Sequence, residues 1–237
     1  MKRKGFTLME IVVSMSIFFV LLTMLGLASR LTTLHWKRNS GKSTVQGQLK
    51  KAQHYLVSDL MQTSFAQLAT TPVPASIGGF DGDAVWFLTS QDPATGEFVI
   101  ADDGTAHWLR NILYYTTVPI GDGCGGSTDS EGYENECPHK LLVRKVIDFG
   151  PPTNAGTETE ALIPVDSIGP YLTRPNGFSV TTMSEPGLEN VTLSANSLTS
   201  LRCWIESTSS GEVQLELQGG STRDGFRSAL EFSVFPL

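Results

Sequence analysis

A long apolar stretch near the N-terminus limits what this chain can fold into more than any other feature. Nineteen consecutive residues, from Ile11 to Ser29, carry no charged side chain, and most of them are aliphatic or aromatic. At a rise of about 1.5 Å per residue, this run spans roughly 28 Å as a helix, close to the thickness of a bilayer's hydrocarbon core. The sequence therefore predicts a membrane-spanning helix.

Glu10 stands immediately before this run. A carboxylate near the start of a spanning helix costs a few kcal/mol where it lies deep, so it suggests a function and a cationic partner. A secretory signal peptide is the alternative, because it also has a basic start, an apolar run and a small-residue cleavage site, for which Gly26-Leu27-Ala28 would serve. The length of the run, Glu10 and a helical pattern that continues past residue 30 all favour a retained anchor.

The residues around Glu10 carry a resemblance to a known family. The segment Lys4-Gly5-Phe6-Thr7-Leu8-Met9-Glu10, followed by Ile11-Val12-Val13, resembles the N-terminus of type IV prepilins and of type II secretion pseudopilins. The resemblance implies a leader peptide of residues 1–5 that a prepilin peptidase removes between Gly5 and Phe6. It also implies N-methylation of the Phe6 amine and a role for Glu10 in filament assembly.

Elementary electrostatics agrees with this role for Glu10. When subunits pack side by side in lipid or in a dry filament core, a buried carboxylate needs a positive group, and the α-amine of a neighbour's Phe6 would supply it. Burying an unpaired charge costs far more than burying a paired one, so the pair would set the axial register between subunits. Further along, Tyr55-Leu56-Val57-Ser58-Asp59-Leu60 resembles the matching part of J-type minor pseudopilins and W-type minor pilins.

Charge is distributed unevenly along the 237 residues, whose net charge is −7. Residues 1–29 carry a net +2, residues 30–69 a net +5, and the remainder a net −14. An acidic head argues against nucleic-acid binding. Basic residues flank both ends of the apolar run, so the count of positive charges does not decide its orientation. The resemblance implies a cytoplasmic N-terminus before cleavage and a head outside.

An amphipathic continuation of the helix is expected over residues 30–70, after a membrane and assembly helix of residues 6–29. Apolar residues recur there at helical spacing and form one stripe, which should lie against the head's sheet: Val45, Leu49, Ala52, Leu56 and Leu60. The segment Thr70-Thr71-Pro72-Val73-Pro74 is expected to end the helix.

From residue 75 to residue 237 the pattern changes to strands and turns. Residues 84–89 and 97–101 are predicted to form a hairpin, and residues 107–117 and 140–149 are longer strand candidates. Residues 150–176 are predicted to be a meandering connection. Alternation of apolar and polar residues is clearest near the C-terminus, in the stretches that begin at Leu201, Val213 and Leu230. The expected fold class is α+β and pilin-like, a long N-terminal helix packed on an antiparallel sheet.

Cysteine usage is typical of an oxidising compartment. Cys124 and Cys137 lie within a glycine-rich acidic loop, and a bridge between them is favoured, worth roughly 3 kcal/mol on the chain-entropy model. Cys203 falls on the apolar face of its predicted strand and is expected to be a buried free thiol. Pairing of Cys203 with either loop cysteine remains an alternative.

No metal site, cofactor or catalytic motif is predicted. Asp122, Asp129 and Glu131 in the acidic loop are weak calcium candidates, but their spacing fits no EF-hand, and a solvated acidic loop is the preferred interpretation. The segment Ser40-Gly41-Lys42-Ser43 imitates the end of a phosphate-binding loop, yet Trp36 occupies the position of that motif's first glycine.

Two function classes follow from these observations. The first is a non-enzymatic structural subunit, a minor pilin or minor pseudopilin, with the prepilin peptidase and methylase, other pilins and the bacterial inner membrane as partners. Its head would lie in the periplasm or in an extracellular filament. The second is a membrane-anchored extracytoplasmic binding protein, an adhesin or ligand binder. The site of N-terminal processing distinguishes the two.

Overall fold

The computed structural model describes residues 7–77, 82–92, 95–120, 140–176, 184–205, 211–221 and 226–236. The chain divides into two compact units, Met1–Ser43 and Thr44–Leu237. Helix α1 (Leu8–Leu60) runs through both of them. Everything that follows α1 belongs to the second unit, called here the head.

Helix α1 has two parts with different surroundings. From Leu8 to residue 40 every side chain is exposed, whereas all the buried residues of the helix lie between Val45 and Leu60. The buried set includes the whole predicted apolar stripe of five residues. The prediction that this stripe packs in the head is therefore confirmed.

The predicted length of the helix was wrong at its C-terminal end. Helix α1 ends at Leu60, and the next hydrogen bonds join residues three apart, from Gln62 N–H to the Asp59 oxygen and from Thr63 N–H to the Leu60 oxygen. A short 3-10 helix, η1 (Phe65–Gln67), leads into strand β1 (Leu68–Pro72), which pairs with the next strand of the sheet. Pairing within the sheet thus overrides the weak local signals, and the proline lies at the end of an edge strand.

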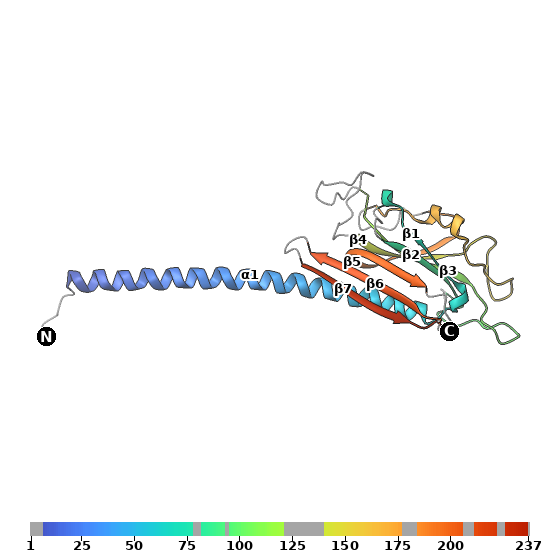
Figure 1. Cartoon of the computed structure of the whole chain (residues 1–237), viewed down its shortest axis with the longest axis horizontal. Coiled ribbons are helices and arrows are strands. Elements are labelled where there is room, and N and C mark those ends of the chain that lie inside the picture. The colour runs from blue at the N-terminus through green and yellow to red at the C-terminus, as the bar shows by residue number, and fades with distance from the viewer. Residues whose placement is uncertain are drawn as a thin grey trace. The chain divides into compact units, whose positions relative to one another are not determined.

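A seven-stranded antiparallel sheet forms the head, and its strands follow one another in sequence order (Figure 1). After β1 come β2 (Asp83–Thr89), β3 (Arg110–Thr117), β4 (Lys140–Ile147), β5 (Leu188–Ile205), β6 (Val213–Ser221) and β7 (Phe226–Val234). The described residues thus combine one long N-terminal helix with an antiparallel sheet, as the α+β prediction required.

The predicted hairpin of residues 84–89 and 97–101 forms only in part. The Asp92 amide donates to the Glu97 oxygen and the Val99 amide to the Ser90 oxygen, so the chain does turn back here, but residues 97–101 do not pair along β2. Strand β2 pairs with β1 on one side and with β3 on the other, so it has no free edge for another strand. Residues 97–101 instead make isolated bridges, between Gln91 and Phe98 and between Ile100 and Ala106.

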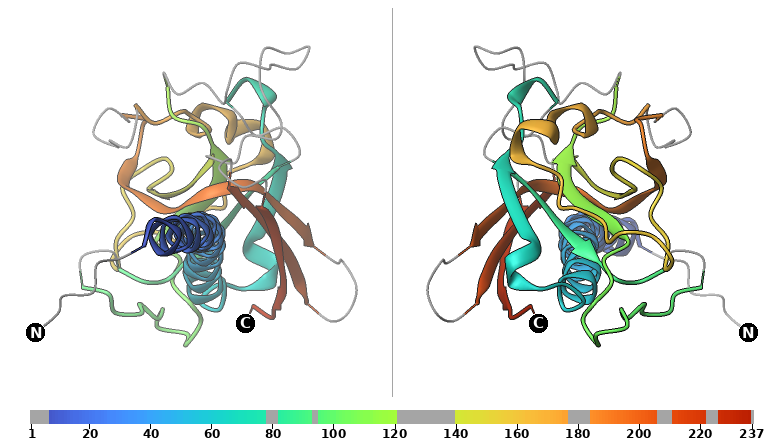
Figure 2. Two further views of the ribbon diagram at one scale, coloured as in Figure 1. Left: turned by 90° about the vertical axis from the view of Figure 1, so that its left-hand side faces the viewer. Right: turned by 90° about the vertical axis from the view of Figure 1, so that its right-hand side faces the viewer.

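Strand β5 bends, and it connects the half of the sheet formed by β1 to β4 with the half formed by β6 and β7. Its first part pairs with β4 and its last part with β6, with register shifts around Leu198 in both ladders. Ser197, at the bend, has a φ of 60°, a conformation that few residues other than glycine adopt. The bend curls the sheet, as the end-on views show (Figure 2).

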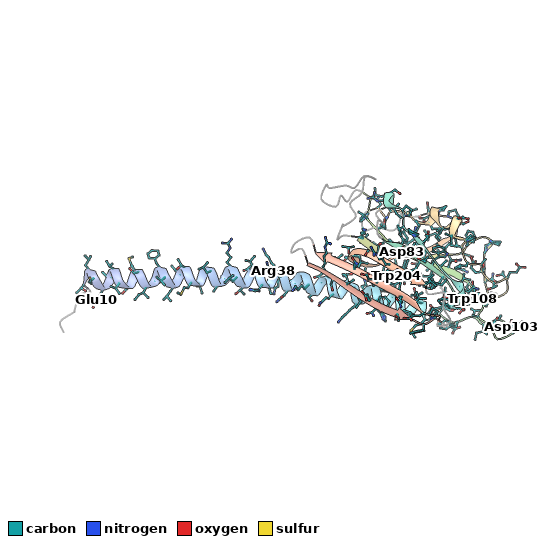
Figure 3. The ribbon with its side chains drawn as sticks, viewed as in Figure 1. Glu10, Arg38, Asp83, Asp103, Trp108 and Trp204 are labelled. Carbon is teal, nitrogen blue, oxygen red and sulfur yellow. The ribbon has the colours of Figure 1, made fainter. Side chains whose placement is uncertain are left out.

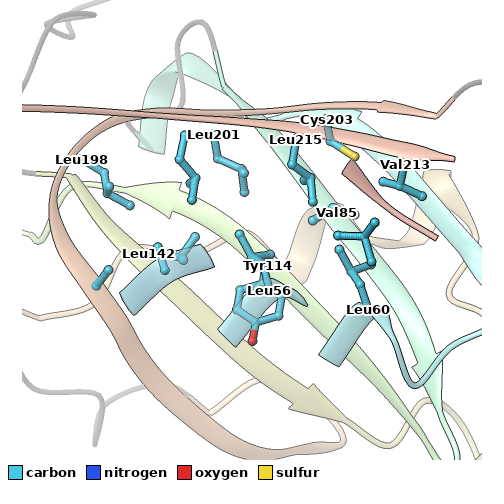
Figure 4. Packing of buried hydrophobic residues seen from close by; sticks show 14 of the residues in the cluster. Leu56, Leu60, Val85, Tyr114, Leu142, Leu198, Leu201, Cys203, Val213 and Leu215 are labelled. Carbon is cyan, nitrogen blue, oxygen red and sulfur yellow. The ribbon is translucent and has the colours of Figure 1, made fainter. Parts of the chain in front are cut away.

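The main core lies between the last turns of α1 and the concave side of this curled sheet. Leu56 and Leu60 are fully buried against residues from β2, β3 and β4 and from the later half of the sheet (Figure 4). The helix approaches β6 closely at Gly219, where a Cβ atom would lie only 3.0 Å from Cγ1 of Val45. Because Gly219 has no side chain, helix α1 can pack closely against β6 at this position.

A second core covers the opposite face of β2, β3 and β4. The connection that was predicted to meander contains two 3-10 helices, η3 (Val165–Ser167) and η4 (Gly169–Tyr171), and supplies Ile163, Ile168, Tyr171 and Leu172 to this cluster. Another short 3-10 helix, η2 (Ala75–Ile77), also lies beside it. Because both faces are covered, these three strands are buried along almost their whole length.

Candidate functional site

The start of helix α1 brings Thr7 and Glu10 together. The Thr7 amide and hydroxyl both donate to Oε2 of Glu10, at 2.9 and 3.0 Å, while the Glu10 amide donates to Oγ1 of Thr7 at 3.4 Å. This reciprocal pattern is a capping box, which satisfies amide groups that the first turn of a helix leaves without partners. The signal was readable in the sequence as threonine followed three residues later by glutamate before an apolar run, and it was missed.

The capping box places Glu10 on the surface of the first turn (Figure 3). Its carboxylate already accepts two hydrogen bonds within its own chain, so part of the cost of removing it from water is offset before any neighbour arrives. The helix N-terminus also favours a negative charge here, because the backbone dipole leaves its positive end at this position. Glu10 is therefore oriented by its own helix and remains exposed.

The apolar run behind Glu10 has no partner within the described chain. Large hydrophobic side chains along it are about half exposed or more, for example Phe19 at 63% and Leu25 at 69%. Within the described residues, α1 is the helix long and apolar enough to cross a membrane, and its most apolar window is entirely unburied. A core helix of a water-soluble domain would bury such a face, so this run indicates membrane anchoring.

Several predicted site residues lie outside the described part of the chain. The proposed cleavage point at Gly5 and Phe6 belongs to them, as do both loop cysteines and the calcium candidates: Cys124, Cys137, Asp122, Asp129 and Glu131. Their roles remain predictions. Among the residues that the structure does describe, no group of three or more His, Cys, Asp or Glu side chains is placed to hold a metal ion.

A buried polar contact fixes the last turn of α1 in the head. Asp59 accepts hydrogen bonds from Nε of Arg144 on β4, at 2.6 Å, and from the hydroxyl of Tyr114 on β3, at 2.7 Å. Burial, and then the neighbouring Asp59 charge, raise the pKa of Tyr114, so this hydroxyl stays protonated and acts as a donor. The sequence places Asp59 within the stretch that resembles minor subunits, and the structure gives it an anchoring contact.

A second polar cluster holds the connection after β4 on the sheet. Glu160 is 4% exposed and accepts hydrogen bonds from the Asn111 side chain at 2.9 Å, the Phe149 amide at 3.0 Å and the Thr153 hydroxyl at 2.8 Å. Burial is the main reason that the pKa of Glu160 rises to about 7, and the charge of Asp148 adds to the effect.

The buried ammonium group of Lys145 also holds the connection between β4 and β5 on the sheet, at a point further along the chain. It donates to the Tyr171 oxygen at 2.7 Å and to Oε1 of Glu185 at 2.6 Å. The charged groups of Asp59, Glu160 and Lys145 thus each have hydrogen-bond partners that hold the connection or the helix on the sheet.

Cys203 is a free, buried thiol in the part of the chain that the structure describes, as expected from its position on the strand. Its backbone amide donates to Oδ2 of Asp83 at 2.9 Å, linking the end of β5 to the start of β2. Burial first, and the Asp83 carboxylate second, raise the pKa of the thiol to about 12, so it is unreactive at neutral pH.

Comparison with known proteins adds one finding at the same end of the chain as the capping box. The family model described as the prokaryotic N-terminal methylation motif matches residues 1–26. No curated protein and no solved structure matches the chain. Residues 1–26 include the glycine and phenylalanine of the proposed cleavage point, Glu10 and most of the apolar run. The match indicates a pilin-like protein that is a substrate of prepilin peptidase.

Proposed function

We propose that this protein is a minor pilin or minor pseudopilin, a non-enzymatic subunit that joins or primes a filament built from the inner membrane. One observation carries the proposal: the methylation motif matches residues 1–26, and helix α1, which begins within them, exposes an apolar surface that no described residue covers. A pilin-like subunit needs such a surface, because neighbouring subunits or lipid must cover it.

Assembly would use Glu10 and the amine of a neighbour's Phe6. Prepilin peptidase cuts after Gly5 and frees the Phe6 amine, which is then methylated and stays positively charged. In the filament, that amine approaches the carboxylate that the capping box holds in place. Because an unpaired buried charge is costly, subunits that are out of register are disfavoured.

The head supports a minor rather than a major subunit. It is large for a repeating filament subunit and carries long connections between its strands, while its buried charges serve its own packing. The J-type and W-type subunits that the sequence resembles around Asp59 belong to this minor class. The head would lie in the periplasm or in an extracellular filament, with a single pass through the inner membrane.

Processing tests this proposal first. In cells that contain prepilin peptidase, mass spectrometry should show a mature chain that begins at Phe6 and carries one added methyl group. Gly5→Ala should block cleavage. A mature N-terminus elsewhere, or normal cleavage of Gly5→Ala, would leave a membrane-anchored binding protein as the better assignment.

Assembly tests the role of Glu10. Glu10→Ala should still insert into the membrane and be processed, since the change removes a charge from a membrane helix, but it should not enter the filament. Co-purification of the processed chain with its filament partners measures this. Incorporation at the normal level would contradict the register role. Finding the chain as the dominant filament protein would contradict its assignment as a minor subunit.

A further inference from the structure

The basic residues that follow the apolar run are unexplained by filament assembly. Arg30, Lys37 and Arg38 are exposed on α1 within the first compact unit (Figure 3 labels Arg38), and we call these three residues the basic collar. They are seven and eight residues apart, so at 3.6 residues per turn they lie on one side of the helix. The collar thus places three positive charges on one side of the helix next to the membrane segment.

Among the described residues, no acidic side chain forms an ion pair with the collar. Helix α1 has no acidic residue between Glu10 and Asp59. The ion pairs found among the described residues involve Arg110, Arg144 and Lys145, all of them in the head. Positive residues are also disfavoured on the side of a membrane to which a segment is translocated. The described residues therefore leave the collar open to an anionic partner outside the chain.

The distance from the apolar run identifies where that partner lies. Arg30 directly follows Ser29, and Lys37 and Arg38 lie about 11 to 14 Å further along the axis, at about 1.5 Å per residue. The headgroup layer extends roughly 5 to 7 Å beyond the hydrocarbon core, and long basic side chains reach back toward it. All three charges then lie within about one Debye length, roughly 8 Å, of the lipid phosphates.

Aromatic and apolar neighbours indicate the same location. Trp36 is 72% exposed and stands beside the two later basic residues, and Leu31 and Leu34 are exposed at 57% and 51%. Tryptophan is enriched at the level of lipid headgroups, where its ring meets both apolar and polar surroundings. Exposed apolar side chains among basic ones therefore suit the boundary between hydrocarbon and headgroups.

We propose that the basic collar binds anionic phospholipid headgroups in the leaflet nearest the head. Bound lipid would hold the unassembled subunit at a fixed depth, with the capping box at the opposite end of the same apolar run. This inference rests on the membrane anchoring in the proposed function. It does not depend on filament assembly or on which system the subunit serves.

Lipid retention by the full chain tests the collar. The protein is placed in nanodiscs that contain equal amounts of phosphatidylglycerol and phosphatidylcholine, and the lipids that stay bound after release are counted by native mass spectrometry. A basic residue near an anionic surface contributes about fivefold in binding, so the wild-type chain should retain phosphatidylglycerol with at least about tenfold preference. The preference should decrease in about 1 M salt, where the Debye length is about 3 Å.

Matched variants separate the collar from general positive charge. The triple variant Arg30→Gln, Lys37→Gln, Arg38→Gln should lose the preference, and the control Lys50→Gln, Lys51→Gln, which removes exposed charges further along α1, should keep it. The proposal is overturned if the wild type shows no preference, if the triple variant retains it, or if the control loses it equally. Loss of a filament partner by the triple variant, without any lipid preference in the wild type, would assign the collar to a protein instead.

Two further measurements on the same samples distinguish failure of this proposal from failure of the proposed function. Resistance to carbonate extraction reports insertion, and cleavage by prepilin peptidase reports processing. A chain that inserts and is cleaved but shows no lipid preference overturns the collar alone. A chain that does not insert overturns the collar and the membrane anchor together.

Discussion

Leu22 and Leu56 are both leucines on helix α1, yet the Leu22 side chain is 46% exposed and the Leu56 side chain is completely buried. The difference follows from the residues around them. Leu22 belongs to a run that is apolar on every side of the helix, so no polar side remains to face water. Leu56 belongs to a single apolar stripe with polar and basic residues on the other sides, which suits packing on a sheet. Helix α1 thus contains an exposed apolar part, which needs lipid or another protein to cover it, and an amphipathic part that packs on the sheet of its own chain.

Truncation of the two leucines should have very different effects. Leu56→Ala should lower the free energy of unfolding of the head by about 3 kcal/mol, because it leaves a cavity in a close-packed core. Leu22→Ala is the matched control and should leave it unchanged, because Leu22 is exposed and lies outside both core clusters of the head. Denaturant unfolding of the full chain in mild detergent, followed by the fluorescence of the buried Trp86, measures both. Equal losses would refute the division of the helix.

Two carboxylates extend the same comparison. Glu10 is exposed, whereas Glu160 is buried and its pKa is raised to about 7, mainly by burial. A raised pKa means that the folded state holds the proton more tightly than the unfolded state, in which it leaves near pH 4.5. The contribution of Glu160 to the free energy of unfolding should therefore be fully present below about pH 4.5 and should be lost as the pH rises toward 7. We expect a loss of about 2 kcal/mol, from 1.36 kcal/mol per pKa unit after allowance for the hydrogen bonds.

Glu160→Gln checks this prediction. The amide keeps an acceptor for Asn111 and Phe149 and offers a donor to Thr153, like the protonated acid, so the decrease with pH should flatten. The exposed Glu158→Gln is the control and should keep the wild-type pH dependence. An unchanged slope in Glu160→Gln would show that Glu160 does not cause the pH dependence.

Gly219 and Gly47 differ in the space that a Cβ atom would find at each position. A Cβ atom on Gly219 would lie 3.0 Å from Val45, 3.1 Å from the Ser197 oxygen and 3.3 Å from Leu49, whereas one on Gly47 would meet nothing within 4 Å. Gly219→Ala should therefore destabilise the head by about 1.5 kcal/mol through overpacking. Gly47→Ala should stabilise it by up to about 1 kcal/mol through helix propensity. If chemical denaturation showed the same change in the free energy of unfolding for both variants, helix α1 would not pack closely on β6 at Gly219.

The sequence predicted those parts of the molecule whose signals are local. The stripe from Val45 to Leu60 repeats at helical period and packs as expected, and the strand candidates at residues 107–117 and 140–149 contain β3 and β4. The end of the helix was missed because residues 68–72 pair with the next strand, β2, and this pairing forms only when the chain folds back on itself. Local propensity contains no information on such a partner.

The second core and the buried charges were beyond prediction for a related reason. Ile163 and Tyr171 come from a stretch without regular periodicity, and their packing is visible only once the sheet exists. Lys145 and Glu160 read as surface residues in the sequence, but their partners are supplied by folding: Asn111, Tyr171 and Glu185. Of the candidate site, the assembly role of Glu10 stays a prediction, while its capping contact with Thr7 could have been predicted from the spacing of threonine and glutamate.

The smallest predicted effect concerns that contact. Thr7→Val keeps the shape of the side chain but removes the hydroxyl that donates to Glu10 and accepts from its amide, so the first turn of α1 should open more often. Loss of an N-terminal cap costs about 1 kcal/mol, which corresponds to about fivefold faster hydrogen exchange at the amides of Glu10 and Ile11 in the full chain in micelles.

Two other threonine variants make this result specific. Thr7→Ser retains a hydroxyl and should exchange like the wild type. Thr32→Val removes a hydroxyl that bonds to the Ala28 oxygen in the middle of the helix, where no amide depends on it, and should leave the first turn unchanged. If Thr7→Val also exchanged like the wild type, the Glu10 carboxylate would be held by the backbone amide alone. Its orientation for a neighbouring subunit would then be a property of the helix end and not of the threonine.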